Sequence, residues 1–201
     1  MSQAHLFAIE LPPHAPSGLR YQDDFISSQQ ERELLDVIAT LPFRNSQYRQ
    51  YTARRRTVNY GAGYDFQHLT ATPAPPIPEF LSGIRARAAA WIDVEPQAFV
   101  QALISEYQPG TPLGWHRDVP EYETVVGISL LTPCRIRFRR YPWNAAEKSD
   151  IFALEPQPRS AYVLSGDARW KWQHSVPAVK TLRYSITLRT PNQKREPQKS
   201  A

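Results

Sequence analysis

Residues 99–107, FVQALISEY, begin the part of the chain whose pattern decides the fold. Short segments rich in β-branched and aromatic residues follow, among them TVVGISLL (124–131), RIRFRRY (135–141) and LRYSITLRT (182–190). Proline, glycine and polar residues separate one segment from the next. Such spacing is typical of a β sandwich, a jelly roll or a barrel. The sequence therefore predicts a mainly β fold for residues 99–190.

The first 98 residues predict two helices around a β hairpin. One helix is expected within FISSQQERELLDVIATLPF (25–43), with Ser28 and Glu31 as a capping box, and another within PEFLSGIRARAAAWI (78–92). Between them, QYRQYTARRRTVNYGAGYDF (47–66) mixes β-forming residues with a glycine break and predicts a hairpin or a pair of strands. The end, 191–201, has no apolar anchor, so we expect a mobile tail. Residues 1–98 should pack on 99–190 as one compact domain.

The composition favours an anionic partner without proving one. The 201-residue chain has a formal net charge of +5, which suits nucleic acid or acidic lipid but also a mildly basic enzyme. The single cysteine, Cys134, excludes an internal disulfide and a thiolate-rich zinc site. No apolar run approaches the ~20 residues of a membrane span, and the start lacks the pattern of a signal peptide. We expect a soluble, cytoplasmic monomer.

A candidate metal site begins in GWHRDVPEY (114–122), where His116 and Asp118 stand two positions apart. On an extended segment, both side chains leave from the same face. The pair alone is a weak signal, but His174 supplies a third candidate on a later predicted strand. Two histidines and one carboxylate are the ligands of non-haem Fe(II) oxygenases. For a lone histidine, a satisfied core position is the commoner explanation.

Two arginines on the last predicted strand suit a dicarboxylate ligand. Arg183 and Arg189 are six residues apart, so they share a strand face with Ser185 and Thr187. Guanidinium groups bind carboxylates through paired, charge-assisted hydrogen bonds. The alternative is a solvent-facing stripe in a basic protein.

In this order, the residues resemble the AlkB family of dioxygenases that depend on Fe(II) and 2-oxoglutarate. The resemblance runs from about Tyr51 to Arg189. It includes Tyr107, nine residues before His116, and the segment LSGDARWKWQHS (164–175). It implies a double-stranded β-helix, or jelly roll, with flanking helices and an N-terminal α/β substrate lid.

The resemblance also implies roles for individual residues. His116, Asp118 and His174 would hold Fe(II), with O2 as co-substrate. Arg183 would bind the distal carboxylate of 2-oxoglutarate with help from Tyr107, and Arg189 would lie near the metal-bound end. Ser105 and Ser185 stand where the family often has asparagines at the 2-oxoglutarate site.

The implied activity is oxidative dealkylation of bases such as 1-methyladenine, 3-methylcytosine or etheno adducts in DNA or RNA, with release of an aldehyde, succinate and CO2. A modified base must leave its stack to reach a buried iron. Tyr51 takes the position of the family's base-stacking aromatic residue, and basic residues nearby fit phosphate contacts. The expected substrate contacts are Tyr51, Arg54, Arg55, Tyr60 and Arg139. A solvated outer face would explain any single arginine equally well.

One departure keeps other substrates open. An acidic residue often stands two positions after the ligand aspartate in this family, whereas this chain has Pro120 there. The alternative hypothesis is the same oxygenase core acting on a protein, such as a methylated lysine. A third hypothesis is a jelly-roll binding module without catalysis.

Overall fold

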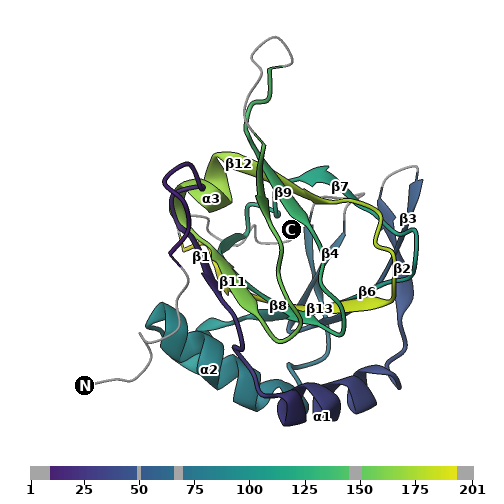
Figure 1. Cartoon of the computed structure of the whole chain (residues 1–201). Helices are drawn as coiled ribbons and strands as arrows, with labels where there is room; N and C mark the ends of the chain where they lie inside the picture. Colours follow the sequence, from purple (N-terminus) through teal and green to yellow (C-terminus); the bar gives the residue numbers. More distant parts are fainter. Residues whose placement is uncertain (1–9, 49–50, 66–69, 145–150, 194–201) are drawn as a thin grey trace.

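The computed structural model describes residues 10–48, 51–65, 70–144 and 151–193 (Figure 1). Its helices are α1 (Ser28–Ile38), α2 (Ser82–Ile92) and the short α3 (Gly166–Trp170), with single 3-10 turns at Glu79–Leu81 and Pro96–Ala98. None of the helices in these ranges is long and apolar enough to cross a bilayer.

Most of the strands form two antiparallel sheets. The large sheet has the order β1-β11-β8-β13-β6-β3-β2, and the small sheet has the order β10-β9-β12-β7. The large sheet comprises β1 (Leu19–Gln22), β2 (Arg44–Tyr48), β3 (Tyr51–Tyr60), β6 (Gln101–Tyr107), β8 (Tyr122–Leu130), β11 (Ala161–Leu164) and β13 (Arg183–Pro191). The small sheet comprises β7 (Leu113–His116), β9 (Ile136–Arg140), β10 (Phe152–Leu154) and β12 (Trp172–Val176). The predicted jelly roll with flanking helices is confirmed.

Strand β13 shows how the large sheet separates two environments. Ile186 and Leu188 point toward α1 and α2 and join a fully buried apolar cluster with Leu34 and Ile84 from those helices. The alternate residues of β13, beginning with Arg183, point the other way and line a pocket between the two sheets. The two helices lie below the large sheet, on the side away from the small sheet (Figure 1). The apolar core is therefore on one face of the sheet and the polar pocket on the other.

The N-terminal part departs from the sequence prediction in three places. The capping box uses Ser27 and Gln30, one residue earlier than expected, because Ser27 is the residue with extended backbone before the helix. Residues 19–22 form β1, which pairs with β11 and which the sequence analysis missed. The stretch TATPAPPIP (70–78), which its prolines predict to be an irregular connection, begins instead with strand β5 (Thr70–Pro73), which pairs with β4 (Ala62–Asp65).

The predicted tail also begins too early. Strand β13 continues through Pro191, and the backbone N–H of Asn192 donates to the carbonyl oxygen of Glu121 at 2.8 Å. The first residues of the expected tail are therefore held against the segment that leads into β8. Residues 194–201 lie outside the described part of the structure.

Gly127 on β8 makes room for an aromatic side chain in the pocket wall. Gly127 is paired with Tyr162 of β11, and a Cβ atom at position 127 would collide with the Tyr162 ring. We expect Gly127→Ala to lower the free energy of unfolding by about 1–3 kcal/mol, the usual cost of overpacking. Chemical denaturation measures this change.

Gly83→Ala is the matched control for that substitution. Gly83 lies in helix α2, and a Cβ atom there would meet no atom within 4 Å. Alanine should stabilise this exposed helical position by up to about 1 kcal/mol. Equal stability of the wild type and Gly127→Ala would show that the Tyr162 ring is not confined as described.

Candidate active site

The two candidate histidines lie side by side on neighbouring strands of the small sheet. His116 ends β7 and His174 lies on β12, and the two are direct partners in the antiparallel register. Their ring centroids are 4.2 Å apart. Nδ1 of His116 lies 2.9 Å from the carbonyl oxygen of Gly114, to which it donates when the proton is on Nδ1. That tautomer leaves Nε2 of His116 free to bind a metal.

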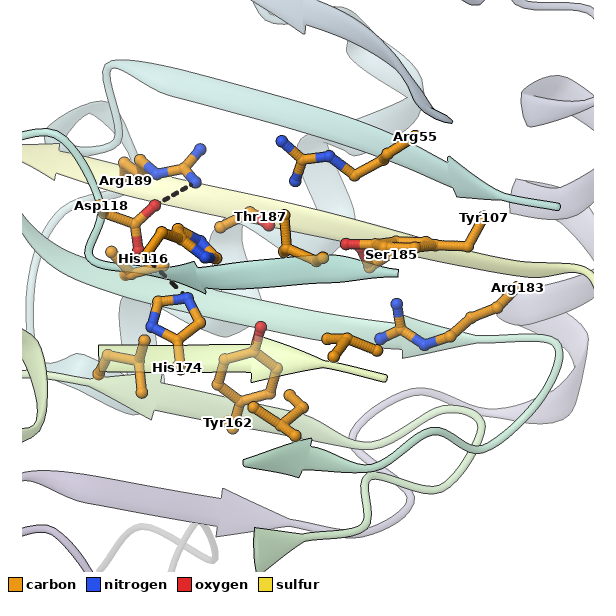
Figure 2. Close-up of a pocket in the computed structure, with 15 residues that line it drawn as sticks. Arg55, Tyr107, His116, Asp118, Tyr162, His174, Arg183, Ser185, Thr187 and Arg189 are labelled. Atoms are coloured by element: carbon orange, nitrogen blue, oxygen red, sulfur yellow. Dashed lines mark hydrogen bonds and ion pairs between the residues drawn. The ribbon is translucent and has the colours of Figure 1, made fainter. Parts of the chain in front are cut away.

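Asp118 follows in the loop after β7 and completes the cluster. Its Oδ2 lies 3.9 Å from Nε2 of His174, and its Oδ1 accepts a 2.7 Å hydrogen bond from Nη2 of Arg189 (Figure 2). Nη1 of Arg189 donates to Oε1 of Gln101 at 2.9 Å, so Arg189 itself is held from two sides. The structure thus brings His116, Asp118 and His174 together, and Arg189 contacts the carboxylate of the group.

The protonation states of this cluster suit metal ligation. Burial lowers the pKa of His116, and burial together with His116 lowers the pKa of His174 to about 3. Burial alone would raise the pKa of Asp118, but the charge of Arg189, followed by the two histidines, holds it well below its usual range. Near neutral pH the histidines are therefore uncharged and the aspartate is ionised. Those are the forms that bind metal ions.

The three side chains are of the types that bind Fe(II), although their donor atoms do not surround a single point. Within the described ranges, no group of three His, Cys, Asp or Glu side chains is already arranged as a closed metal site. The Asp118 carboxylate is turned toward Arg189. Two imidazoles and one carboxylate are nevertheless the combination that non-haem Fe(II) oxygenases use. Binding an ion would require these side chains to close in on it.

The opposite end of the pocket holds a buried cation that lacks an anion. Arg183 is only 2% exposed and lies beside the ring of Tyr107, with its guanidinium carbon 5.0 Å from the ring centroid. Its Nη2 donates to Oγ of Ser129 at 3.2 Å, while Nε has no hydrogen-bond partner among the described residues. No carboxylate in those ranges pairs with Arg183. A buried guanidinium is costly without a counter-charge, so Arg183 fits a carboxylate of 2-oxoglutarate.

Both predicted serines lie between the arginines on the pocket face of the large sheet. Ser185 lines the pocket and is paired with Ser105 in the register of β13 and β6. Oγ of Ser105 is buried without a hydrogen-bond partner in the described residues, and Ser105 itself does not line the pocket. Sequence reasoning missed Gln101, Ser129 and Tyr162, which also surround the arginines or the pocket. Only the strand register reveals the first two, because Gln101 is opposite Arg189 and Ser129 is opposite Ser185.

Strand β3 contributes one of the predicted substrate residues to the pocket. Arg55 lines the pocket, with its guanidinium directed toward the end that holds His116 and Arg189 (Figure 2). Arg54 is exposed outside the pocket. Tyr60 does not line the pocket: it packs against the apolar cluster, with its ring 6.4 Å from that of Phe80.

Two further predicted contacts have other surroundings. The side chain of Tyr51 lies outside the described part of the structure. Arg139 lies on β9 and does not line the pocket. Residues alternate between the two faces of β9, since Ile136 and Phe138 are buried while Arg137 and Arg139 are partly exposed.

Comparison with known families decides which family the chain belongs to. The family model described as the 2OG-Fe(II) oxygenase superfamily matches residues 18–195. The chain belongs to this superfamily. It is therefore a 2-oxoglutarate-dependent Fe(II) dioxygenase, and the family uses Fe(II) and 2-oxoglutarate with O2.

Similar proteins place this oxygenase in the AlkB family. It is 30% identical over 183 residues to the alkylated DNA repair protein ALKBH8 homologue of Arabidopsis thaliana, covering 80% of this chain and 51% of that protein. It is 24% identical over 170 residues to the tRNA (carboxymethyluridine(34)-5-O)-methyltransferase ALKBH8 of Mus musculus, covering 80% of this chain and 24% of that protein. The oxygenase thus spans about half the length of the Arabidopsis relative and about a quarter of the mouse relative.

A solved structure supports the fold. The structure of OsALKBH1 matches 91% of this oxygenase and 99% of its own chain, with a TM-score of 0.67 and 18% sequence identity. At that identity, the match concerns the fold alone.

Arg169 of the oxygenase fixes the loop that follows Asp118. This buried arginine on α3 donates from Nη2 to the carbonyl oxygens of Val119 at 2.6 Å and Tyr122 at 2.8 Å. We expect Arg169→Ala to lower the free energy of unfolding by about 3 kcal/mol, because charged hydrogen bonds are lost and buried carbonyls lose their donor. Chemical denaturation of the metal-free protein measures it.

Lys171→Ala provides the control for the Arg169 substitution. Lys171 follows the same short helix and forms an exposed ion pair with Asp167 at 3.0 Å. Removing an exposed pair should change stability by at most about 1 kcal/mol. A similar loss for both variants would mean that the guanidinium contacts of Arg169 do not stabilise the loop.

Proposed function

We propose that this AlkB-like oxygenase oxidises alkyl groups on damaged bases of DNA or RNA, releasing an aldehyde, succinate and CO2. The observation that carries the proposal is that the arginine-rich strand β3 contributes a side chain to the oxygenase pocket. Arg55 reaches from β3 into the same pocket as the His116, Asp118 and His174 cluster. A substrate that enters between lid and pocket would thus meet a positive charge close to the oxidising centre.

The proposed sites for iron and for 2-oxoglutarate lie at different ends of the pocket. His116, Asp118 and His174 would hold Fe(II), which together with 2-oxoglutarate and O2 supplies the oxidation of a C–H bond. Arg183 would bind one carboxylate of 2-oxoglutarate, with Tyr107 packed beside it. Apolar side chains between the sheets, including Val125 and Ile136, keep water away from this part of the pocket.

A base is a suitable substrate for three reasons. The chain has a net charge of +5, and the lid strand carries Arg54, Arg55 and Arg56 in succession. An exposed residue such as Arg54 suits a phosphate contact, which positions a nucleic acid without reading its sequence. We also propose that Tyr51 stacks on the base taken out of its strand, a contact that usually contributes about 1–3 kcal/mol.

The names of the relatives point to nucleic acids as well. The Arabidopsis relative is named for alkylated DNA and the mouse relative for a tRNA uridine. The methyltransferase activity in the mouse name does not carry over, because this chain covers 24% of that protein. From the names of the relatives we therefore take only the proposal that the substrate is a nucleic acid.

The test measures succinate and formaldehyde with Fe(II) and 2-oxoglutarate. The substrates are matched DNA and RNA oligonucleotides that carry 1-methyladenine or 3-methylcytosine, and mass spectrometry follows loss of the methyl group. Ethenoadenine is tested by loss of the adduct. Wild-type protein should repair at least one of these lesions, and His116→Ala should repair none.

The remaining outcomes contradict the proposal in distinguishable ways. Succinate formation that is not coupled to any modified oligonucleotide, but rises with a methylated-lysine peptide, would favour a protein substrate. Pro120, in place of an acidic residue, is the sequence feature that raised that alternative. Absence of Fe(II)-dependent turnover with both substrate classes would contradict dealkylation in either form.

A further inference from the structure

The outer face of the small sheet carries aromatic and arginine side chains stacked on one another. The guanidinium carbon of Arg139 lies 4.4 Å from the ring centroid of Trp115 and 4.5 Å from that of Trp143. Arg137 also lies over Trp115, at 5.0 Å. We call these residues, together with Gln173, the outer-sheet patch: Trp115, Arg137, Arg139, Trp143 and Gln173.

The strand register shows that the outer-sheet patch is separate from the pocket. Gln173 of β12 is paired with Arg139 of β9, and Nε of Arg139 donates to Oε1 of Gln173 at 2.9 Å. The next residue of β12, His174, points to the opposite face, into the pocket. Trp115 likewise precedes His116 on β7. The patch and the candidate iron ligands thus occupy opposite faces of the same strands.

The two arginines of the outer-sheet patch have no acidic partner in the part of the chain that the structure describes. Among the described residues, no carboxylate forms an ion pair with Arg137 or Arg139. Burial, followed by the charge of Arg137, lowers the pKa of Arg139. An anion bound at this face would offset the repulsion between the two guanidinium groups.

The outer-sheet patch also keeps an aromatic surface open to solvent. Trp143 is 49% exposed, and nearby Tyr141 is 44% exposed with Arg117 stacked over its ring at 3.7 Å. Large apolar side chains are seldom so exposed in a cluster without a binding role. Flat aromatic faces combined with arginines are the combination that binds unstacked bases and their phosphates.

We propose that the outer-sheet patch binds a single-stranded stretch of nucleic acid. The exposed ring of Trp143 stacks on a base, and Arg137 and Arg139 contact phosphates. An acidic peptide would match the charge but not the aromatic faces, and a duplex would hide its bases from Trp143. This inference rests on the proposed function for its substrate class, and it adds a second contact surface outside the pocket.

The position of β7 connects the patch with the pocket. Strand β7 is at the edge of the small sheet, with β12 as its neighbour in the sheet. Trp115 and His116 are consecutive residues on its two faces. A strand bound at the patch can therefore cross this edge, so that one nucleotide lies in the pocket while its neighbours remain on the patch.

The experiment measures binding separately from turnover. Fluorescence anisotropy follows unmodified single-stranded RNA and DNA 12-mers of the same sequence, without Fe(II) or 2-oxoglutarate. An abasic 12-mer supplies phosphates without bases, a duplex hides the bases, and a poly-glutamate peptide supplies negative charge alone. We expect wild-type protein to bind at least one single strand about tenfold more tightly than the abasic strand, as base stacking predicts.

The variants remove one property of the patch at a time. The double variant Arg139→Gln with Trp143→Ala should weaken single-strand binding about tenfold or more. Arg139→Gln alone should reduce the dependence of log affinity on log salt by about 0.7. Trp143→Phe keeps an aromatic face and should bind nearly as tightly as wild type. Arg32→Gln, at an exposed position on α1, removes a charge elsewhere and should leave affinity unchanged.

Three results would overturn the inference. They are unchanged affinity in the double variant with native circular dichroism, equal affinity for abasic or duplex DNA, and equally good competition by poly-glutamate. Absence of measurable binding by wild-type protein would also overturn it. Patch-dependent binding without repair of any alkylated oligonucleotide would support the nucleic-acid site on the patch and contradict the proposed function. Repair without patch-dependent binding would support the proposed function and contradict the site on the patch.

Discussion

Replacing His174 with alanine is expected to eliminate tight Fe(II) binding and to reduce Fe(II)-dependent succinate formation by more than about 100-fold. Loss of a residue that merely orients a metal ligand typically costs 10–100-fold, and His174 is proposed as a ligand itself. Its imidazole is buried, uncharged near neutral pH and directly paired with His116. Anaerobic calorimetry with Fe(II), or with Co(II) as a stable substitute, measures the affinity.

Two further variants make the His174 result specific. His14→Ala removes a histidine whose ring contacts Phe152, at 5.6 Å between centroids, away from the pocket, and should leave metal affinity unchanged. His174→Gln preserves much of the side-chain volume and should still fail to bind the metal tightly. If His174→Ala and wild type bound Fe(II) equally, the cluster would not be the iron site.

Replacing Arg183 with glutamine is expected to weaken 2-oxoglutarate binding by at least about 30-fold. Truncating one partner of a buried charged pair commonly costs 2–5 kcal/mol. The free protein should respond differently. Because the buried Arg183 guanidinium has no carboxylate partner among the described residues, its removal should leave the stability of the ligand-free protein unchanged or raise it.

Thermal denaturation with and without 2-oxoglutarate tests both parts of the Arg183 prediction. Wild-type protein with a metal bound should gain stability from the cosubstrate, whereas Arg183→Gln should gain almost none. Arg183→Lys should give an intermediate shift, because lysine keeps the charge but loses the planar fork of the guanidinium. A glutamine variant that is stabilised as strongly as wild type would place the cosubstrate carboxylate elsewhere.

Strand alternation was enough to predict which residues of β13 share the pocket face. Arg183, Ser185, Thr187 and Arg189 are separated by even numbers of residues, and all of them line the pocket. The partners across the sheet depend on register, which a single sequence does not determine. Gln101 and Ser129 were missed for that reason. The pairing of His116 with His174 was expected from the family resemblance rather than from the pattern itself.

The same alternation separates two of the predicted substrate contacts on β3. Arg55 and Tyr60 are separated by an odd number of residues, so a regular strand places them on opposite faces. Arg55 lines the pocket, while Tyr60 joins the apolar cluster that packs against the helices. Their spacing along the strand therefore already indicated that Arg55 and Tyr60 could not both face the pocket. Strand β1 was missed because its four residues, LRYQ, are too few to give a period.

The place of β3 and β2 at the end of the large sheet has a consequence for evolution and for protein engineering. In the order β13-β6-β3-β2, the strands of the proposed lid, β3 and β2, have β6 as their one neighbour in the rest of the described sheet, while the candidate iron ligands lie on β12, on β7 and in the loop after β7. Insertions or exchanges in the lid would therefore alter the choice of target and leave the oxidation machinery intact. Members of one lineage could diversify by replacing this border segment, and a chimaera that carries a relative's lid should inherit that relative's preference.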